Sequence, residues 1–272
     1  MRGSSITLED YPLEQALDIF RDAGFDVIEM WRRDLKRCKT DELRMKFAAY
    51  ARAKGISMGG LNAVGEDYYQ PFGTDQQLEQ TLEGLKADAD FALSLGTKNV
   101  LIWEGRAPQG TTESHWMSQL LPRLIELLRA AIAAVKSNGV RFLVEPHPFT
   151  VGMSDQFLIK LCDALGPESF GVTFDFCHYG VGRPNDYLEA IPKLGHRIVN
   201  IHFSDSDQKT SELHFPPGFG RLRIQAMLEA FRDIHFDGTL TLDLYGYPMP
   251  VHGLHVSAAR QREACDFLNL PY

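Results

Sequence analysis

Residues 140–148 read Val-Arg-Phe-Leu-Val-Glu-Pro-His-Pro, a short apolar run that ends in a carboxylate, a proline and a histidine. Four of the six residues before Pro146 are apolar, as expected for a strand that is covered on both faces. The carboxylate of Glu145 then lies at the exit of a buried strand, where an unpaired charge is very unfavourable. The run therefore predicts a buried strand with a cation beside Glu145.

Three later apolar runs end in the same way, each with one side chain that can bind a metal ion. They are Phe170–Asp175, Arg197–His202 and Gly238–Asp243. A single carboxylate at a strand end can equally cap a helix or pair with an arginine, but four successive ends are better explained by one site. We therefore expect Glu145, Asp175, His202 and Asp243 to bind one divalent metal ion.

The rest of the chain alternates short apolar runs with helical patterns. Expected strands cover residues 25–31, 56–61, 99–104, 140–145, 170–175, 197–202 and 238–243, after an opening run at residues 3–7 that is short for a strand. Expected helices cover residues 12–20, 41–54, 76–95, 114–137, 154–165, 185–194, 224–234 and 257–268.

About eight strand–helix units in this length predict a single (β/α)8 TIM-barrel domain over residues 1–272, with its active site at the carboxyl ends of the strands. An open doubly wound sheet is the alternative, although no G-x-G-x-x-G motif follows the first strand.

The composition limits the partners that we expect. The formal charge is −8, so the chain lacks the basic excess that a nucleic-acid backbone or an anionic membrane would require. The basic cluster of Arg32, Arg33, Lys36 and Arg37 is expected to be a solvated loop or helix start. Neither a secretory apolar region nor a membrane-spanning run is found, so we expect a cytoplasmic protein.

The four cysteines are widely spaced and form no C-x-x-C pair. Cys38, Cys162, Cys177 and Cys265 are therefore expected to be reduced thiols, not a disulfide framework or a cysteine-built zinc site. Cys177 is close enough to Asp175 to be considered as a ligand, although most such cysteines are only buried.

Several motifs resemble those of the xylose isomerase-like barrels, a family that includes sugar-phosphate isomerases and epimerases, inosose and dehydroshikimate dehydratases and, more distantly, endonuclease IV. The resemblance covers nearly the whole chain and rests on residues 24–31, 144–148, 174–178, 200–205 and 214–220. It implies a metal-dependent enzyme that acts on a small carbohydrate, and it implies dimers or tetramers. It also implies that Glu145 and Asp243 flank the substrate carbon as acid and base.

The residue types support these acid and base roles independently of the resemblance. A metal ion that polarises a carbonyl lowers the pKa of the adjacent C–H, and a carboxylate on each face can then remove and return a proton. Three oxygen ligands and one imidazole suit Mn²⁺ best, with Mg²⁺, Co²⁺ or Zn²⁺ as alternatives. Asp243 departs from the glutamate usual in the family and is shorter by one methylene, which favours a lyase or a one-base reaction.

Further polar residues near the expected barrel mouth are candidate substrate contacts. They are His178, His147, Glu29, Glu104, Asp205 and His214. Salt bridges are an equal interpretation for the two glutamates, and loop ordering is an alternative for Asp205 and His214. Gly218 and Gly220 could offer backbone N–H groups to a phosphate, although a single G-x-G is more often only a turn.

These observations favour a sugar or keto-polyol isomerase or epimerase. A metal-dependent dehydratase that acts on a cyclic keto-polyol is the second hypothesis, and a metal-dependent hydrolase similar to endonuclease IV is the third. The acidic composition argues against the hydrolase. A barrel that has lost its metal and serves only as a subunit is the alternative outside enzymes.

Overall fold

Eight parallel strands close into a barrel in the computed structural model, which describes residues 1–35, 41–106, 108–148 and 150–272. Each strand pairs with the next along the chain, and the last pairs with the first. The strands are β1 Arg2–Ser4, β2 Val27–Trp31, β3 Ser57–Asn62, β4 Asn99–Ile102, β5 Arg141–Val144, β6 Phe170–Asp175, β7 Ile198–Phe203 and β8 Thr239–Leu242. The predicted (β/α)8 barrel is therefore confirmed. Of the short opening run at residues 3–7, only Gly3 and Ser4 belong to the first strand, and the rest lies in the 3-10 helix Ser5–Leu8.

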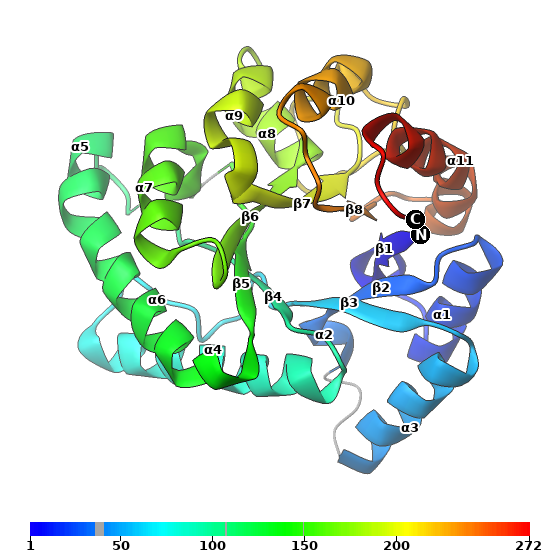
Figure 1. The fold of residues 1–272 in the computed structure, drawn as a ribbon, viewed down its shortest axis with the longest axis horizontal. Helices are drawn as coiled ribbons and strands as arrows, with labels where there is room; N and C mark the ends of the chain where they lie inside the picture. The colour runs from blue at the N-terminus through cyan, green and yellow to red at the C-terminus, as the bar shows by residue number, and fades with distance from the viewer. Residues whose placement is uncertain (36–40, 107, 149) are drawn as a thin grey trace.

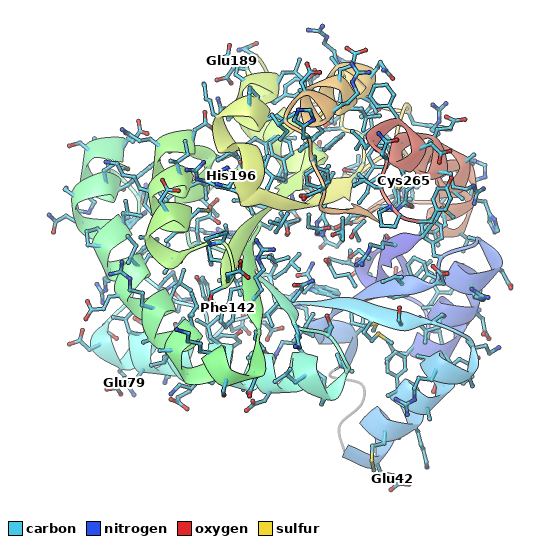
Figure 2. The ribbon with its side chains drawn as sticks, in the orientation of Figure 1. Glu42, Glu79, Phe142, Glu189, His196 and Cys265 are labelled. Atoms are coloured by element: carbon cyan, nitrogen blue, oxygen red, sulfur yellow. The ribbon has the colours of Figure 1, made fainter. Side chains whose placement is uncertain are left out.

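Helices surround the ring of strands (Figure 1). They are α1 Leu13–Asp22, α2 Arg32–Leu35, α3 Asp41–Ala53, α4 Asp75–Ser94, α5 Glu113–His115, α6 Leu121–Val135, α7 Asp155–Leu165, α8 Phe176–Gly182, α9 Tyr187–Leu194, α10 Ile224–Asp233 and α11 Pro250–Leu268. Charged side chains on their outer faces, such as Glu42, Glu79 and Glu189, point into solvent (Figure 2). Among the described residues, no helix combines the length and the apolar character that a bilayer crossing requires.

The alternation of side chains along the strands decides which residues face the barrel interior. In β5, Phe142 and Val144 are fully buried in the apolar core that includes the surrounding helices, whereas Leu143 lines the interior. Glu145 follows Leu143 by two residues and shares its face, because side chains alternate with a period of two. The same alternation turns the polar ends of the next three strands inward.

The barrel interior is polar below those strand ends. The amide of Asn200 accepts hydrogen bonds from the hydroxyls of Thr239 and Thr241, at 2.7 and 3.1 Å, and donates one to Thr173. These residues come from three adjacent strands, so the hydrogen bonds connect the strands that supply the polar ends. A buried polar network whose members are satisfied favours one arrangement of the strands.

Two helices differ from the sequence prediction. The helix predicted over residues 114–137 is divided by a π-helical turn at Trp116–Leu120, directly before Pro122, which has no N–H to continue the regular ladder. The last helix begins at Pro250, seven residues before the predicted start. A proline suits the first turn of a helix, because the N–H it lacks would be unpaired there.

The helix α8 was not predicted. Its sequence contains Gly180 and Gly182, which are weak helix formers, and it follows β6 without a loop. The side chain of Asp175 accepts a hydrogen bond from the backbone N–H of His178 at 2.7 Å and caps the helix. Asp175 therefore has one oxygen that fixes the local backbone and a second that is left for the barrel mouth.

The basic cluster near residue 32 is only partly as predicted. It does begin a helix, but Arg32 is not solvated as expected, because its guanidinium pairs with the buried carboxylates of Glu66 and Asp88. Lys36 and Arg37 lie outside the described residues, as does Cys38. The other three cysteines are buried free thiols.

The seam between the first and last strands is held by the C-terminal helix. The amide nitrogen of Gln261, from α11, donates to the carbonyl oxygens of Arg2 and Leu240, both at 2.9 Å. Gln261 is 1% exposed, so these hydrogen bonds are enclosed in the protein. The amide therefore connects β1 to β8 where the barrel closes.

Gln261→Ala is expected to lower the free energy of unfolding by about 2–3 kcal/mol, because it removes two buried hydrogen bonds and creates a cavity. Urea denaturation followed by circular dichroism measures this loss. Gln225→Ala, at an exposed position of α10, is the matched control and should change stability by less than about 0.5 kcal/mol. Equal effects of the two substitutions would refute a role for Gln261 in closing the barrel.

Candidate metal centre and active site

The four predicted metal ligands come together at the barrel mouth. Glu145, Asp175, His202 and Asp243 each offer a ligand atom, and these atoms all lie within 4.8 Å of one another. They follow or end four consecutive strands, and the register places Asp175 directly beside His202. All four are buried, so three carboxylates share a site from which water is largely excluded.

The ligand atoms of this cluster that have no hydrogen-bond partner could bind a cation. His202 Nδ1 lies 3.3 Å from Asp243 Oδ2 and 3.6 Å from Asp175 Oδ2, and it also contacts Glu145 Oε1. Neither His202 Nδ1 nor Asp175 Oδ2 has a hydrogen-bond partner in the described structure, although both are buried. Buried polar atoms are rarely left without partners. A divalent metal ion would satisfy both, and the donor set of oxygens and one imidazole suits such an ion.

The electrostatics of the cluster also favour a cation at its centre. Burial disfavours the charged form of His202, but the carboxylates of Glu145 and Glu29 outweigh burial and raise its pKa well above the usual value. Burial raises the pKa of Asp175 as well. The group of carboxylates thus favours a positive charge at its centre, which a proton on His202 or a bound metal ion can supply.

Glu29 lies behind His202 instead of in the open pocket. Its Oε1 is 3.1 Å from His202 Nε2, on the side of the ring away from the other three ligands. It is absent from the residues that line the mouth cavity and lines the barrel interior. A carboxylate that accepts the second N–H of a metal-bound histidine fixes the ring and its tautomer. The structure therefore gives Glu29 an orienting contact with His202, which agrees with the salt-bridge interpretation and not with the substrate contact that was equally expected.

A cavity of about 140 Å³ opens above the cluster. Of the four ligands, only Glu145 and Asp243 line it, whereas Asp175 and His202 are fully buried beneath. Its walls combine three aromatic rings with polar groups; the lining residues include Trp31, Trp103, Tyr245, Arg33, Asn62, His147, His178, His214 and Glu212. Such a mixture of flat apolar surface and convergent polar groups is typical of small-molecule sites.

Three of the predicted histidines form one wall of this cavity. The ring of His178 lies between those of His147 and His214, with centroids 4.3 and 5.2 Å away. Burial lowers the pKa of His178 to about 3, so this imidazole is neutral and can offer or accept a hydrogen bond without a change in charge. His214 Nε2 lies 3.0 Å from the carbonyl of Ser211, which leaves Nδ1 facing Asp175 and Asp243 at 3.8 and 3.6 Å.

Glu212 was missed by the sequence analysis. Its Oε1 lies 2.8 Å from His147 Nε2, and this hydrogen bond is the main reason why the pKa of Glu212 falls to about 2. The side chain lines the cavity from the loop between β7 and α10. The only signal in the sequence was its position two residues before His214, and acidic residues are too common in loops for that spacing to identify it.

Cys177 is buried beside Asp175 and His214, and the three could form a second group of metal ligands. Its sulfur, however, lies 3.7 to 3.8 Å from the backbone carbonyls of Thr210, Ser211 and Leu213. A cysteine S–H is a weak donor that can reach only such nearby acceptors. The contacts of Cys177 therefore connect it to the loop that carries these three carbonyls.

Glu104 and Asp205 lie apart from the cavity. Glu104 is fully buried and accepts a hydrogen bond from the N–H of Gly152, and burial raises its pKa to about 8. Asp205 accepts from the backbone N–H groups of Gly218 and Gly220, both at 2.9 Å. Asp205 thus orders the loop, and those two N–H groups already have an acceptor and are not available to a phosphate.

One protein family and several known proteins match this chain. The profile of the family described as "Xylose isomerase-like TIM barrel" matches residues 17–269. An inosose isomerase of Bacillus velezensis is 23% identical over 252 residues, covering 89% of this chain and 87% of that protein. An inosose dehydratase of Geobacillus thermodenitrificans is 25% identical, covering 75% and 65%, and a fructoselysine 3-epimerase of Escherichia coli is 24% identical, covering 92% of each.

A solved structure gives the same fold. The IOLI protein, crystallised with a bound zinc atom, superposes with a TM-score of 0.80 at 19% identity, covering 99% of this chain and 98% of that one. At that identity the likeness concerns the fold. The indication of a divalent metal ion in this chain comes from its own cluster of four buried ligand atoms.

Glu29→Gln is expected to weaken Mn²⁺ binding by about 10–100-fold, because the neutral amide lowers the basicity of the His202 ring that it orients. Isothermal titration calorimetry measures the dissociation constant. Glu104→Gln is the matched control, since Glu104 is also a buried glutamate but is hydrogen-bonded to Gly152 instead of to a cluster ligand, and the affinity of this variant should be close to that of the wild type. An unchanged affinity in Glu29→Gln would contradict the orienting role.

Proposed function

Because the chain belongs to the xylose isomerase-like TIM barrel family, we propose that it is a divalent-metal-dependent isomerase or epimerase of a small sugar, sugar phosphate or keto-polyol. The curated relatives are an isomerase, a dehydratase and an epimerase, which supports a reaction at the carbon next to a carbonyl. We propose Mn²⁺ as the metal, on the chemistry of three carboxylates and one imidazole.

One observation carries the assignment of roles. Of the four clustered ligands, Glu145 and Asp243 face the cavity, whereas Asp175 and His202 are enclosed beneath it. Carboxylates at the cavity surface can reach a substrate, and enclosed ones can only hold the metal. Glu145 and Asp243 are therefore the proposed acid and base, and all four residues are the proposed ligands.

The chemistry follows from these positions. A bound divalent ion would polarise the substrate carbonyl and make the adjacent C–H more acidic. Glu145 removes the proton from one side, and Asp243 faces the same cavity as the second proton donor or acceptor. Return of the proton to the same carbon with inversion is epimerisation, and its return to the neighbouring carbon is isomerisation. The neutral His178 and the aromatic walls position the hydroxyls and the C–H face of the substrate.

A dehydratase is the second candidate, because the surroundings of Asp243 weaken it as a base. One of its oxygens accepts a hydrogen bond from the N–H of Tyr245 at 3.0 Å. Although burial opposes ionisation, the hydrogen bond to His214 and the charges of His214 and His202 lower the pKa of Asp243 to about 2, which makes it a weak base. An active site with one effective base, Glu145, would favour loss of a hydroxyl over return of the proton to the opposite face.

Glu145→Gln tests the proposal directly. The folded variant should retain weakened Mn²⁺ binding and lose at least about 100-fold of its solvent-deuterium uptake into a panel of ketoses and keto-polyols, because the base is removed. Nuclear magnetic resonance in D₂O measures the uptake. Glu79→Gln, on the outer face of α4, is the control and should behave as the wild type (Figure 2). Full exchange in Glu145→Gln would remove Glu145 from the mechanism.

Asp243→Glu separates the two candidate reactions. The added methylene extends the carboxylate by about 1.5 Å, so an epimerase whose second base is too short should gain about tenfold in exchange at the inverted carbon. Asp175→Glu lengthens a ligand that does not face the cavity and should bring no gain. If exchange collapses in Asp243→Glu while Mn²⁺ stays bound, the pocket requires the shorter side chain and the dehydratase is favoured.

A further inference from the structure

Of the described carboxylate and guanidinium groups that line the active-site cavity, only one has no partner of opposite charge. Glu145 and Asp243 belong to the metal cluster, and Glu212 Oε1 lies 2.8 Å from His147 Nε2. The fourth group is the guanidinium of Arg33, which follows β2 by two residues. The charge of Arg33 is therefore the one in this lining that no neighbouring side chain offsets.

Arg33 differs in this respect from its neighbour Arg32. The guanidinium of Arg32 forms ion pairs with the buried carboxylates of Glu66 and Asp88. In the part of the chain that the structure describes, no carboxylate lies within ion-pair distance of Arg33, and its one hydrogen bond runs from Nη2 to the carbonyl oxygen of Gly65 at 2.8 Å. The two adjacent arginines thus have different roles: Arg32 connects parts of the fold, whereas the charge of Arg33 faces the cavity.

Arg33 is held in position although it is exposed. Its guanidinium carbon lies 5.1 Å from the centre of the Trp31 ring, which is within the range of a cation–π contact. The carbonyl of Gly65 that it binds belongs to a fixed turn, because the side chain of Asn62 accepts a hydrogen bond from the N–H of Val64 at 3.0 Å. A side chain that is positioned before binding loses less entropy when a ligand arrives.

The N–H groups of Arg33 that remain unused decide the chemistry of the ligand. A guanidinium has several N–H donors in a planar fork, and the hydrogen bond to Gly65 occupies only one of its nitrogens. The fork matches two oxygens of a carboxylate or a phosphate, and such hydrogen bonds are stronger because both partners are charged. A hydroxyl group can accept one N–H but does not offset the charge. An anionic group is therefore the better partner for Arg33.

A row of rings connects Arg33 to the metal cluster along the wall of the cavity. The guanidinium lies over Trp31, and the centre of the Trp31 ring is 6.4 Å from that of Tyr245. The Tyr245 ring is in turn 6.3 Å from His214, whose Nδ1 faces Asp243 at 3.6 Å. Because the rings lie between the guanidinium and the metal ligands, a molecule that contacts both must carry its anionic group at a distance from its carbonyl.

We propose that the substrate carries an anionic group, either a phosphate ester or a carboxylate, that binds Arg33 while the carbonyl end lies at the metal cluster. The inference rests on the proposed function for the position of the carbonyl end. It narrows the substrate from small sugars and keto-polyols in general to their anionic derivatives. Arg33 is then the residue that distinguishes a charged substrate from a neutral one with the same carbon skeleton.

Matched sets of ligands test this inference on the Mn²⁺-loaded protein. Each set consists of a ketose (fructose, ribulose or xylulose), its phosphate ester at the carbon farthest from the carbonyl, and the acid with a carboxylate at that carbon. Isothermal titration calorimetry measures the dissociation constants. One of the two anionic forms should bind at least about tenfold more tightly than the neutral ketose, as expected for a charge-assisted contact, and the form that does so identifies the group. Arg33→Gln should remove this gain, and Arg33→Lys should keep part of it, because lysine retains the charge without the planar fork.

Arg221→Gln is the control, because Arg221 is an exposed arginine of the loop between β7 and α10 that is not part of the cavity lining, and it should keep the full gain. Anionic ligands that bind no more tightly than the neutral ketoses would overturn the inference, as would a gain that survives in Arg33→Gln or is lost equally in Arg33→Lys. If the anionic ligands show the expected pattern but none takes up deuterium, Arg33 binds them and the proposed reaction is wrong. If neutral ketoses take up deuterium and the anionic forms bind no better, the reaction stands and the inference is wrong.

Discussion

The arrangement of the barrel mouth depends on the attraction between several buried carboxylates and one positive centre. Glu145, Asp175 and Asp243 surround His202 Nδ1, and Glu29 holds the other side of the same ring. Carboxylates gathered in a buried site repel one another strongly unless a cation lies among them. A divalent ion can supply this positive charge. The positions of the ligands around it also decide which carboxylates face the cavity.

The barrel supplies that geometry through the alternation of its strands. Residues of one parity face the interior, where Asn200 and the threonines of β6 and β8 form a satisfied polar layer. The next inward positions along the chain are the ligands. Because the strands are parallel, their polar ends all lie at the carboxyl end of the barrel and meet at the mouth, where Asp175 pairs directly with His202. The fold therefore places the ligands, while the loops determine what can approach them.

The sequence allowed the barrel and the four clustered residues to be predicted, because both depend on short-range pattern. An apolar run that ends in a polar residue identifies a strand end, and its recurrence identifies the barrel. The position of Glu104 could have been predicted as well. Asn99 and Leu101 face the interior, so Glu104 falls on the opposite parity and turns to Gly152.

Other features depend on contacts between distant segments. Glu29 lies beside His202, 173 residues away along the chain, and a register shift between Ile28 and Glu29 alters its level relative to β3. No local pattern reveals such a shift. Glu212 reaches His147 from a long loop whose course is fixed by Asp205 and by the glycines it binds.

Native mass spectrometry of the protein after Mn²⁺ loading and desalting shows whether the four strand ends hold one metal ion. About one ion per chain is expected in the wild type, and its loss is expected in His202→Ala. His196→Ala, which removes an exposed histidine between β6 and β7, should keep the ion (Figure 2). A wild-type protein without an ion, or an ion retained in His202→Ala, would contradict the account.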